Sequence, residues 1–467
     1  MIKIKKYTIF VENEAIERWK LWDEAVIARR DLAERTRAGD LLFIFSSTSK
    51  EFVFVIDYCL SEGRSLAIIP EQLSTTQFHQ LVLKYEPEAI ICTTHKQKRM
   101  LENLKPLIWR DFNKLSIAHF ARSENRVSGS LALLMFTSGT TGSSQACKIS
   151  WQNLLSSLEQ ITQSLDLSCY DSVITTLSFD YIYGLSVLVS HMYVGGGIYL
   201  YPYSILDRSF QQLLVATENY NLNFVPAQLQ ILKKLGFEKY FSSRLRFLTQ
   251  AGGNLPTDDK LEIAEIMRAI QARFYIMYGQ TEASPRICVN PVHKNLYPID
   301  SVGGPVSNGN ISVINMSEFG EGEIVYSGPN VFAGYATSRN DLLLCEEKDE
   351  LHTGDLGYWD ASGGLVISGR IKRIAKLSGI RINLDFLDSV LSKNARSNFH
   401  TIEHDGALIS FYSAEKVDNI RLREELRKMK INPNLVGLVK VSSFPVTRSG
   451  KIDYPALKNL LATRVCP

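Results

Sequence analysis

The sequence predicts an α/β protein with a large N-terminal domain of mixed and parallel sheets and helices, a small β-rich subdomain and a small α+β C-terminal domain. Three features of the 467 residues lead to this prediction. Short apolar runs alternate with longer amphipathic stretches. Near Gly303 the pattern changes to short strands separated by Gly, Pro and Asn, and a charged segment follows Gly369-Arg370. Alternation of this kind is typical of sheets with helices on their faces.

The alternation indicates buried strands joined by helical crossovers. Strands that are buried on both faces read as continuous hydrophobic runs, whereas a helix on a sheet repeats its apolar residues about every 3.6 positions. The stretch WQNLLSSLEQITQSL at 151–165 has the helical period. The expected strands are LLFIF at 41–45, SLAIIP at 65–70, AIIC at 89–92, SVITTL at 172–177 and GGIYLYP at 196–202.

Changes in residue composition and charge along the sequence divide the chain into domains. The runs ISVIN, GEIVYSG and GLVISG are short strands between Gly, Pro and Asn, which indicates a β-rich subdomain at about 303–370. Residues 373–467 hold 16 Lys and Arg against 9 Asp and Glu, a net charge of +7, while the remainder carries −4. We therefore expect a large domain over 1–371 and a separate basic domain over 372–467, with a charged helix at 421–430.

Composition excludes several classes of partner. Lys and Arg number 52 and Asp and Glu 49, so the net charge of +3 does not favour nucleic-acid binding. The N-terminus meets acidic residues before the apolar part of a signal peptide could form, and the most apolar stretch, 185–200, is too short to span a bilayer. We expect no membrane insertion and a cytoplasmic location. The seven cysteines are scattered without a C-x-x-C pair, which fits a reducing compartment: Cys59, Cys92, Cys147, Cys169, Cys288, Cys345 and Cys466.

The strongest local motif is a Gly- and Thr-rich loop after an apolar strand. The segment LALLMFTSGTTGSS covers 131–144. Its glycines allow backbone N–H groups to converge on an oxyanion, and its hydroxyls add donors, so the loop suits phosphate. An exposed turn is the alternative interpretation. The chain has no G-x-x-x-x-G-K-[ST] string, which argues against a P-loop kinase or NTPase.

This loop closely resembles the phosphate loop of the ANL superfamily of adenylate-forming enzymes, which comprises acyl- and aryl-CoA synthetases, nonribosomal-peptide adenylation domains and luciferases. Further segments that are similar to the family's motifs follow in order over about residues 130–460, whereas residues 1–130 resemble the family more weakly. These segments are AGGNLP at 251–256, YGQTE at 278–282, SVGGPV at 301–306, GEIVYSGPNVFAGY at 322–335, HTGDLGYW at 352–359, SGRIKRIAKLSGIRI at 368–382 and SGKIDYPAL at 449–457.

The resemblance implies a ligase that uses ATP and Mg²⁺ to turn a carboxylic acid into an acyl-AMP, with release of pyrophosphate. Positioning and electrostatics would supply the catalysis. By motif match, Tyr278 would stack on adenine, Thr281 would contact the α-phosphate and Glu282 would bind Mg²⁺. Without the resemblance, Tyr278 would be interpreted as a core aromatic. The other residues implied to bind ATP or AMP in this part are Thr137, Ser138, Gly139, Thr140, Thr141, Gly142, Ala251, Gly252, Gly253, Gly279 and Gln280.

The resemblance also assigns roles near the C-terminus. Asp355 would accept both ribose hydroxyls, a role for an ionised acceptor, and Arg370 would reach the same ribose or the phosphate. Lys372 matches the hinge about which a small mobile C-terminal domain turns between adenylation and thioester formation. Gly379 would line the pantetheine tunnel. Lys451, in an SGK sequence, would bind the substrate carboxylate and phosphate oxygens as a mobile point charge that is essential to adenylation.

The chain departs from the family in the phosphate loop. The family continues TSGTTG with x-P-K-G, but Gln145 stands where that lysine is customary. Either Lys148 substitutes for it, or backbone groups and hydroxyls hold the pyrophosphate. Lys451 is then the principal cation expected in adenylation.

The acyl pocket allows two alignments around LSFDYIYGL at 177–185. Asp180 matches the aspartate with which amino-acid-activating domains bind the α-ammonium, or Tyr181 matches the gating aromatic of aryl and acyl ligases. A buried aspartate needs a cationic partner, so the two alignments imply different substrates. Further expected pocket residues, of types that are often found in cores, are Tyr183, Met277, Asn223 and Arg286.

The acyl acceptor has several alternatives. The leading hypothesis is a stand-alone enzyme that transfers the acyl group to a phosphopantetheine thiol, either of CoA or of a separate acyl or peptidyl carrier protein. The basic C-terminal domain suits both of these acidic acceptors. An amino-acid adenylation enzyme and an amide-forming ligase are alternatives. A non-catalytic nucleotide-binding scaffold is a further one, against which the intact Lys451, Glu282, Asp355 and Arg370 argue.

Overall fold

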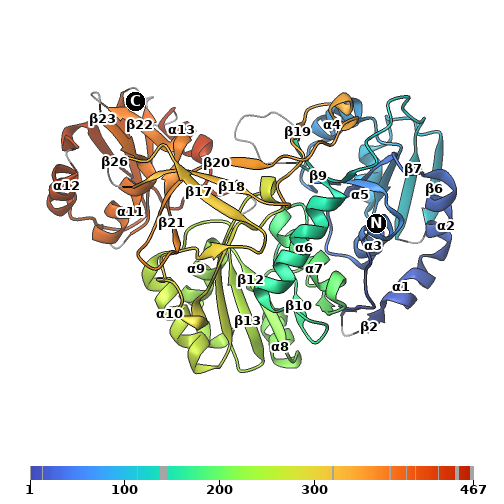
Figure 1. Cartoon of the computed structure of the whole chain (residues 1–467), viewed down its shortest axis with the longest axis horizontal. Helices are drawn as coiled ribbons and strands as arrows, with labels where there is room; N and C mark the ends of the chain where they lie inside the picture. Colours follow the sequence, from blue (N-terminus) through green and yellow to red (C-terminus); the bar gives the residue numbers. More distant parts are fainter. Residues whose placement is uncertain are drawn as a thin grey trace. The chain divides into compact units, whose positions relative to one another are not determined.

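A computed structural model gives the structure of the chain (Figure 1). Two compact units divide it: Met1–Asn310 with Tyr326–Leu351, and Ile311–Val325 with His352–Pro467. The predicted α/β fold class is confirmed, while the predicted boundary after residue 371 and the hinge at Lys372 stay predictions. The described residues are 2–12, 14–112, 114–136, 145–317, 320–377, 380–395, 397–404, 406–429, 431–447 and 452–462.

A nine-stranded sheet with parallel central strands forms one half of the first unit. Its strand order is β16-β15-β14-β13-β12-β10-β11-β1-β2, and β14 to β1 run parallel to one another. The flanking strands β2, β15 and β16 are antiparallel to their neighbours. The strands are β1 (Thr8–Val11), β2 (Glu14–Glu17), β10 (Ser172–Ile174), β11 (Gly197–Tyr199), β12 (Tyr220–Phe224), β13 (Leu245–Gln250), β14 (Arg273–Tyr278), β15 (Cys288–Pro291) and β16 (Gly304–Pro305).

An eight-stranded sheet forms the other half of this unit. Its order is β19-β9-β8-β4-β3-β5-β7-β6, with β8, β4, β3 and β5 parallel. Most of its strands are buried along their whole length, which is why they read as unbroken apolar runs. The strands are β3 (Leu41–Phe45), β4 (Ser65–Ile69), β5 (Ala89–Cys92), β6 (Ile108–Phe112), β7 (Leu115–His119), β8 (Leu131–Phe136), β9 (Ala146–Ser150) and β19 (Tyr335–Ala336).

Three helices pack between the two sheets. They are α3 (Lys50–Glu62), α6 (Trp151–Leu165) and α7 (Ile182–Val194), and their side chains share one hydrophobic core with residues of both sheets. Helix α7 is buried on nearly every side, as expected for a sequence that is apolar all round. Ser49 and Ser150 cap the N-termini of α3 and α6 through hydrogen bonds to backbone N–H groups.

Other helices cover the outer faces of the sheets. In Figure 1, α8 (Arg208–Ala216), α9 (Pro226–Leu235) and α10 (Thr257–Ala269) flank β12 and β13, with which they form a second core. A third core lies under α4 (Thr75–Tyr85) and α5 (His95–Met100). The N-terminal helices are α1 (Arg18–Glu24) and α2 (Val26–Arg35).

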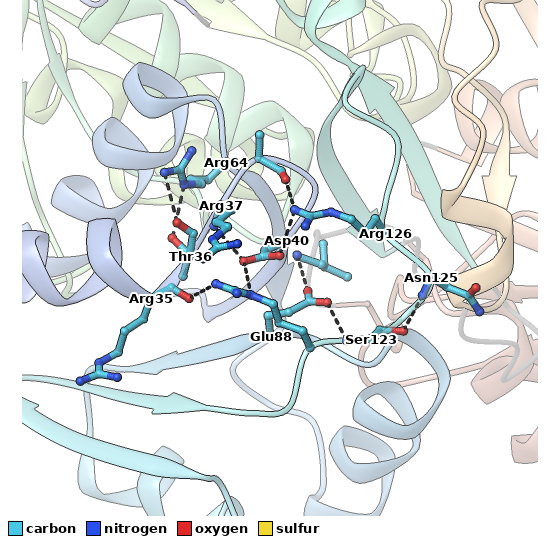
Figure 2. Close-up of polar contacts among 12 residues, drawn as sticks. Arg35, Thr36, Arg37, Asp40, Arg64, Glu88, Ser123, Asn125 and Arg126 are labelled. Atoms are coloured by element: carbon cyan, nitrogen blue, oxygen red, sulfur yellow. Dashed lines mark hydrogen bonds and ion pairs between the residues drawn. The ribbon is translucent and has the colours of Figure 1, made fainter.

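A network of charged side chains fastens the segment between α2 and β3 (Figure 2). Asp40 is 2% exposed and lies 3.5 Å from a guanidinium nitrogen of Arg126. Glu88 is 4% exposed and accepts a 2.6 Å hydrogen bond from the Leu41 N–H at the start of β3. Arg339 completes this network with a 2.6 Å ion pair to Glu88. Every member has a partner, so the network is a structural clamp.

The second unit consists of small sheets and helices. A four-stranded sheet has the order β17-β18-β20-β21, a hairpin joins β22 to β23, and a three-stranded sheet has the order β24-β25-β26. The elements are β17 (Asn310–Ile314), β18 (Gly322–Ser327), β20 (Glu350–Trp359), β21 (Leu365–Arg370), β22 (Ile374–Leu377), β23 (Ile380–Asn383), α11 (Leu384–Ala395), β24 (Phe399–His404), β25 (Ala407–Tyr412), α12 (Asn419–Lys428), β26 (Val436–Lys440) and α13 (Tyr454–Ala462).

Candidate active site

The carboxyl ends of β10, β12, β13 and β14 meet at one edge of the nine-stranded sheet, because these strands are parallel neighbours. Four segments of the sequence continue from those ends. In open α/β sheets, ligands bind outside the carboxyl ends of the strands. The segments are 175–181, Val225-Pro226, 251–253 and 279–282. Two of the predicted ATP-binding motifs and the predicted acyl-pocket segment are thereby brought together.

Gly252 is held against the aromatic side chain of Tyr181. The Gly252 backbone has a φ of +85°, which favours glycine. A Cβ at this position would lie 2.5 Å from the Tyr181 hydroxyl and 3.3 Å from Val225. The neighbouring Ala251 is buried, and Gly253 lies next to the Pro226 ring. The glycine motif and the pocket segment are therefore in direct contact.

The segment from Tyr278 to Glu282 makes a tight turn at the end of β14. Tyr278 is half-buried, and its carbonyl accepts a 2.9 Å hydrogen bond from the Ile287 N–H. Gly279 packs against the Pro285 carbonyl so closely that a Cβ would collide with it. Gln280 precedes the short 3-10 helix η2 (Thr281–Ala283), in which Thr281 and Glu282 are also half-buried.

Asn330 fastens the far side of this turn, a role that the sequence analysis missed. Its amide Nδ2 donates to the Ala283 carbonyl at 2.5 Å and to the Arg286 carbonyl at 2.8 Å. Its Oδ1 accepts a 2.7 Å hydrogen bond from the Tyr326 hydroxyl. Asn330 lies in the family-like segment GEIVYSGPNVFAGY, so the GPN sequence could have indicated a backbone-binding amide. Asn330 thereby binds both ends of the segment from residue 283 to residue 286.

The carboxylate of Glu282, the predicted magnesium ligand, is held by a tyrosine hydroxyl. Its Oε1 accepts a 2.7 Å hydrogen bond from the Tyr335 hydroxyl, which orients the carboxylate. Burial, together with this carboxylate, raises the pKa of Tyr335, so the phenol stays a donor. Within the described ranges, no group of three His, Cys, Asp or Glu side chains could hold a metal. Mg²⁺ that accompanies a nucleotide usually takes one or two carboxylates plus phosphate oxygens, which Glu282 fits.

Two tyrosines and one arginine form an aromatic-cationic cluster. Tyr183, on the first turn of α7, is 2% exposed and meets the Tyr181 ring edge-to-face at 6.2 Å. The Arg286 guanidinium lies 4.6 Å from the centre of the Tyr183 ring. Burial raises the pKa of Tyr183 and lowers that of Arg286. Met277 is 3% exposed and belongs to the hydrophobic core.

A buried series of hydrogen bonds begins beneath this cluster. Tyr183 and Thr249 are joined through their hydroxyls at 2.6 Å, and Thr249 continues to Asn223 Oδ1 at 2.6 Å. Asn223 donates to Asn221 at 3.1 Å, and the Asn221 amide lies 3.0 Å from Nε2 of His191. Burial lowers the pKa of His191 to about 4, so the ring is neutral at pH 7. Asn223 is thus connected to Tyr183 through the hydroxyl of Thr249.

Asp180 and Tyr181 take different positions. The half-buried Asp180 accepts a hydrogen bond from the Ser178 hydroxyl, two residues earlier. Phe179 between them stacks on Phe52 at 5.4 Å and anchors the segment to the core. Tyr181 reaches Gly252. The structure therefore brings Tyr181 to the glycine motif. Which of the two alignments describes the acyl pocket stays a prediction.

Lys148 is committed to a structural contact. Its ammonium donates to the carbonyls of Asp341 and Leu344, both at 2.8 Å, and the residue is 8% exposed. These bonds tie β9 to the chain after Arg339. Of the two explanations for the absent phosphate-loop lysine, this geometry favours the one that relies on backbone groups and hydroxyls.

The second unit brings Asp355 and Arg370 together. They are register partners on β20 and β21, and Arg370 Nε lies 2.9 Å from Asp355 Oδ1. Asp355 is 5% exposed, whereas the Arg370 side chain is 59% exposed. Lys372 is exposed in the 3-10 helix η5 (Ile371–Arg373). The remaining predicted site residues lie outside the described residues: Thr137, Ser138, Gly139, Thr140, Thr141, Gly142, Gly379 and Lys451.

Arg373, directly after the predicted hinge residue, is anchored inside the second unit. It pairs with Asp385 at 2.8 Å and Asp388 at 2.6 Å. Its guanidinium also lies 3.9 Å from the Tyr454 ring, three residues after Lys451 in the sequence. This residue does not stand out in the sequence, because its partners are up to 81 positions away along the chain.

Comparisons with known proteins identify the class of this fold and site. The family model "AMP-binding enzyme" matches residues 32–336. A 2-succinylbenzoate–CoA ligase of Enterococcus faecalis is 24% identical over 468 residues, covering 96% of this chain and 92% of the relative. The corresponding ligase of Bacillus cereus strain Q1 is 25% identical over 370 residues, covering 78% and 75%.

Solved structures share the fold. An O-succinylbenzoate coenzyme A synthetase from Bacillus subtilis, in complex with ATP and magnesium ion, has a TM-score of 0.78 at 21% identity over 97% of both chains. ATP-bound MatB from Rhodopseudomonas palustris has a TM-score of 0.79 at 18% identity, covering 98% of this chain and 96% of its own. An amide bond synthetase from Marinactinospora thermotolerans has a TM-score of 0.79 at 15% identity, covering 98% and 97%.

The chain belongs to the AMP-binding enzyme family, within the adenylate-forming ANL superfamily. It is an ATP-dependent ligase of the acid–thiol type, which activates a carboxylic acid as an acyl-AMP. The resemblance noted in the motifs is thereby confirmed. Among the described residues, helices that combine the length and apolarity needed to cross a membrane are absent.

Proposed function

We propose that this enzyme joins CoA to an organic acid that carries no α-ammonium group. The observation that supports this choice is the buried Arg286 beside Tyr181 and Tyr183. An amino acid would bring a second positive charge into a pocket that already holds one, and like charges repel strongly where water is excluded. An acid without an ammonium group avoids this repulsion. The CoA acceptor is supported by the relatives, which are named as CoA ligases.

The predicted site residues have complementary roles in this proposal. Tyr278 stacks on adenine beside 251–253, and Asp355 and Arg370 hold the ribose. Thr281 contacts the α-phosphate, and Glu282 holds Mg²⁺, which offsets phosphate charge as pyrophosphate leaves. The orientation of Glu282 by Tyr335 supports its role. Thr137 to Gly142 hold the outer phosphates, and Lys451 binds the carboxylate and the α-phosphate.

Thioester formation requires a second arrangement of the chain in this proposal. The region from 372 to 467 turns at Lys372 and presents the loop of Gly379 to the pantetheine arm. The same arm is carried by CoA and by acyl carrier proteins, so a separate carrier protein is the alternative acceptor. Cysteines without disulfide partners among the described residues support a cytoplasmic setting for this chemistry.

Pyrophosphate exchange into ATP, measured against pools of amino acids, aryl acids and other organic acids, tests the acid class. We expect exchange with acids that lack an α-ammonium group. Thioester formation is then measured with CoA, with a phosphopantetheinylated carrier protein and with an amine in place of the thiol. Exchange that only amino acids support, or amide formation without any CoA thioester, would contradict the proposal.

Lys451→Ala tests the division of the reaction between two arrangements. We expect adenylation to be lost, because the variant lacks the principal cation for the carboxylate and phosphate. Thioester formation from preformed acyl-AMP is expected to be largely spared. Lys458→Ala, a nearby lysine on α13, is the matched control and is expected to retain both steps. An equal loss of both steps in Lys451→Ala would argue against rotation about Lys372.

A further inference from the structure

The guanidinium of Arg286 is a buried charge without an anionic partner among the residues that the structure describes. Arg286 is 3% exposed, and its buried Nε–H donates to no acceptor within the described ranges. No Asp or Glu of those ranges lies in ion-pair distance of it. The guanidinium lies over the face of Tyr183, whose ring centre is 4.6 Å away. A tyrosine ring attracts a cation, but it cannot fill the hydrogen-bonding directions of a guanidinium.

The backbone around Arg286 holds this side chain in place. The residue lies between the η2 turn and β15, where the Asn330 amide binds its carbonyl at 2.8 Å. The Ser157 hydroxyl donates to the Ser284 carbonyl, and Gly279 packs against Pro285. The Ile287 N–H donates a 2.9 Å hydrogen bond to the Tyr278 carbonyl. The backbone of Arg286 is therefore fixed at the edge of the sheet where the predicted pocket residues meet, and its guanidinium lies over the Tyr183 ring.

An isolated buried charge is expensive unless an anion compensates it. Burial lowers the pKa of Arg286, which is the direction expected for a cation that has lost water without gaining a carboxylate. Arginine nevertheless stays protonated in proteins. Tyr181 and Tyr183, which interact with Arg286, are neutral phenols with pKa values raised by burial. Because the described residues supply no anion, one that completes this site would come from a ligand.

We propose that Arg286 binds a second carboxylate of the acid substrate, so that the enzyme activates one carboxyl group of a dicarboxylic acid and holds the other. This inference rests on the proposed function, because it places the acid beside Tyr181 and Tyr183. The planar fork of a guanidinium matches a carboxylate in two parallel hydrogen bonds, which selects this group over neutral acceptors. Arg286 is then a specificity residue that does not touch the carboxyl group that reacts with ATP.

The test compares matched acids that differ in one carboxylate. Pyrophosphate exchange and CoA thioester formation are measured for the full chain with 2-succinylbenzoate and with 4-oxo-4-phenylbutanoate, which lacks the ring carboxylate. A second pair is glutarate and butyrate. We expect a preference of at least about 30-fold in kcat/KM for one of the dicarboxylic acids over its monocarboxylic partner, the lower end of what a buried charge pair contributes.

Arg286→Met keeps the volume of the side chain and removes its charge. We expect it to lose this preference, mainly through a higher KM for the dicarboxylic acid, while the monocarboxylic partner is used as well as before or better. Arg286→Lys is expected to restore part of the preference, because it keeps the charge without the fork. Arg268→Met, an exposed position on α10, is the control for loss of one positive charge and is expected to behave like the wild type.

The outcomes separate the two proposals. If monocarboxylic acids are used as well as dicarboxylic ones, or if Arg286→Met leaves the preference unchanged, this inference is wrong and the proposed ligase function stands. If Arg286→Met abolishes exchange with every acid while its unfolding transition is native-like, Arg286 binds the reacting carboxylate and this inference is again wrong. If only amino acids support exchange with the wild type, the proposed function and this inference fail together.

Discussion

Two arginines of the first unit are equally buried, at 3% exposure each, but their surroundings differ completely. Arg339 pairs with Glu88 through both Nη atoms, at 2.6 and 3.2 Å, and its Nε donates to the Asn125 carbonyl at 2.7 Å. Arg286 has the face of Tyr183 and a buried Nε without a partner in the described part of the chain. Arg339 is therefore part of the structural scaffold, whereas Arg286 has no anionic partner among the described residues.

This difference teaches that burial alone does not identify a functional charge. The Arg339 network, which includes the Glu88 of Figure 2, satisfies each polar group and joins residues that are 251 positions apart. Such saturation is what folding stability requires of a buried ion pair. At Arg286 the fold accepts an uncompensated charge at the edge of the sheet where ligands bind, and stability that is forgone at such a position is typically connected with function.

The largest expected effect is on stability, and it separates the two arginines directly. Arg339→Met should lower the free energy of unfolding by about 3–5 kcal/mol, because it leaves Glu88 buried without a cation. Arg286→Met should change it by less than about 1 kcal/mol or raise it, since a poorly compensated buried charge is removed. Urea unfolding of the full chain measures both. Equal losses would show that Arg286 is a scaffold residue and would remove the contrast.

The buried hydrogen bonds that lead from Tyr183 to His191 should make the stability of the fold depend on pH. The pKa of His191 is about 4 in the folded chain, below its ordinary value of 6.5. A lowered pKa means that the folded state binds fewer protons, so this stabilisation is complete above about pH 6.5 and is lost as the pH falls toward 4. The loss reaches about 3 kcal/mol. Unfolding measured from pH 7 to 4 should show it in the wild type.

His191→Gln keeps an acceptor for Asn221 but cannot titrate, so this part of the pH dependence should disappear. His95→Gln, at an exposed position on α5, is the control and should leave the pH dependence as it is. A wild-type profile that His191→Gln does not flatten would mean that other groups cause the acid sensitivity.

Gly252→Ala should disturb the contact between the glycine motif and Tyr181. The new Cβ would lie 2.5 Å from the Tyr181 hydroxyl, and the φ of +85° is unfavourable for alanine. We expect a loss of about 1–2 kcal/mol of stability together with a higher KM for the acid. Tyr181→Phe removes the colliding oxygen, so the double variant should recover part of the KM change. If Tyr181→Phe gives no rescue, the two residues do not share the pocket.

Tyr335→Phe should have the smallest effect. It removes the 2.7 Å hydrogen bond to Glu282 and leaves the ring in place. One hydrogen bond contributes about 1 kcal/mol, so the Mg²⁺ concentration required for half-maximal pyrophosphate exchange should rise about fivefold. Tyr170→Phe, which alters an 80% exposed tyrosine, should leave this requirement unchanged. An unchanged requirement in Tyr335→Phe as well would argue that Glu282 does not hold the metal.

Local pattern predicted much of the fold. The expected strands at 41–45 and 89–92 match β3 and β5, and the stretch 151–165 matches α6, because complete burial and helical period both leave a clear imprint on sequence. The expected strand at 172–177 ends at Ile174 instead. Beyond that residue, the hydroxyl of Thr176 donates to the Asn223 carbonyl at 2.5 Å. Apolar pattern cannot register such a side-chain contact.

The candidate site was predictable as motifs but not as contacts. The order of motifs indicated Tyr278, Glu282, Asp355 and Arg370, and their roles stay predictions. Which of these residues contact one another depends on pairing between strands that are distant in the sequence. The commitment of Lys148 to the carbonyls of Asp341 and Leu344 depends on residues more than 190 positions away.

The series of hydrogen bonds from His191 to Tyr183 has a direction as well as a length. Nδ1–H of the neutral ring donates to a backbone carbonyl of its own helix at 2.7 Å, which leaves Nε2 as an acceptor for Asn221. Asn223 then donates to Asn221, and Thr249 donates its only proton to Asn223.

The hydroxyl of Tyr183 must therefore donate to Thr249, so its own proton points away from the substrate. Toward the pocket it can offer lone pairs and no proton. The tautomer of a histidine four residues along this relay thus decides that the Tyr183 hydroxyl is an acceptor toward any further partner, while the Arg286 guanidinium over the same ring is a donor. A substrate group that both accepts and donates would find one partner on each side.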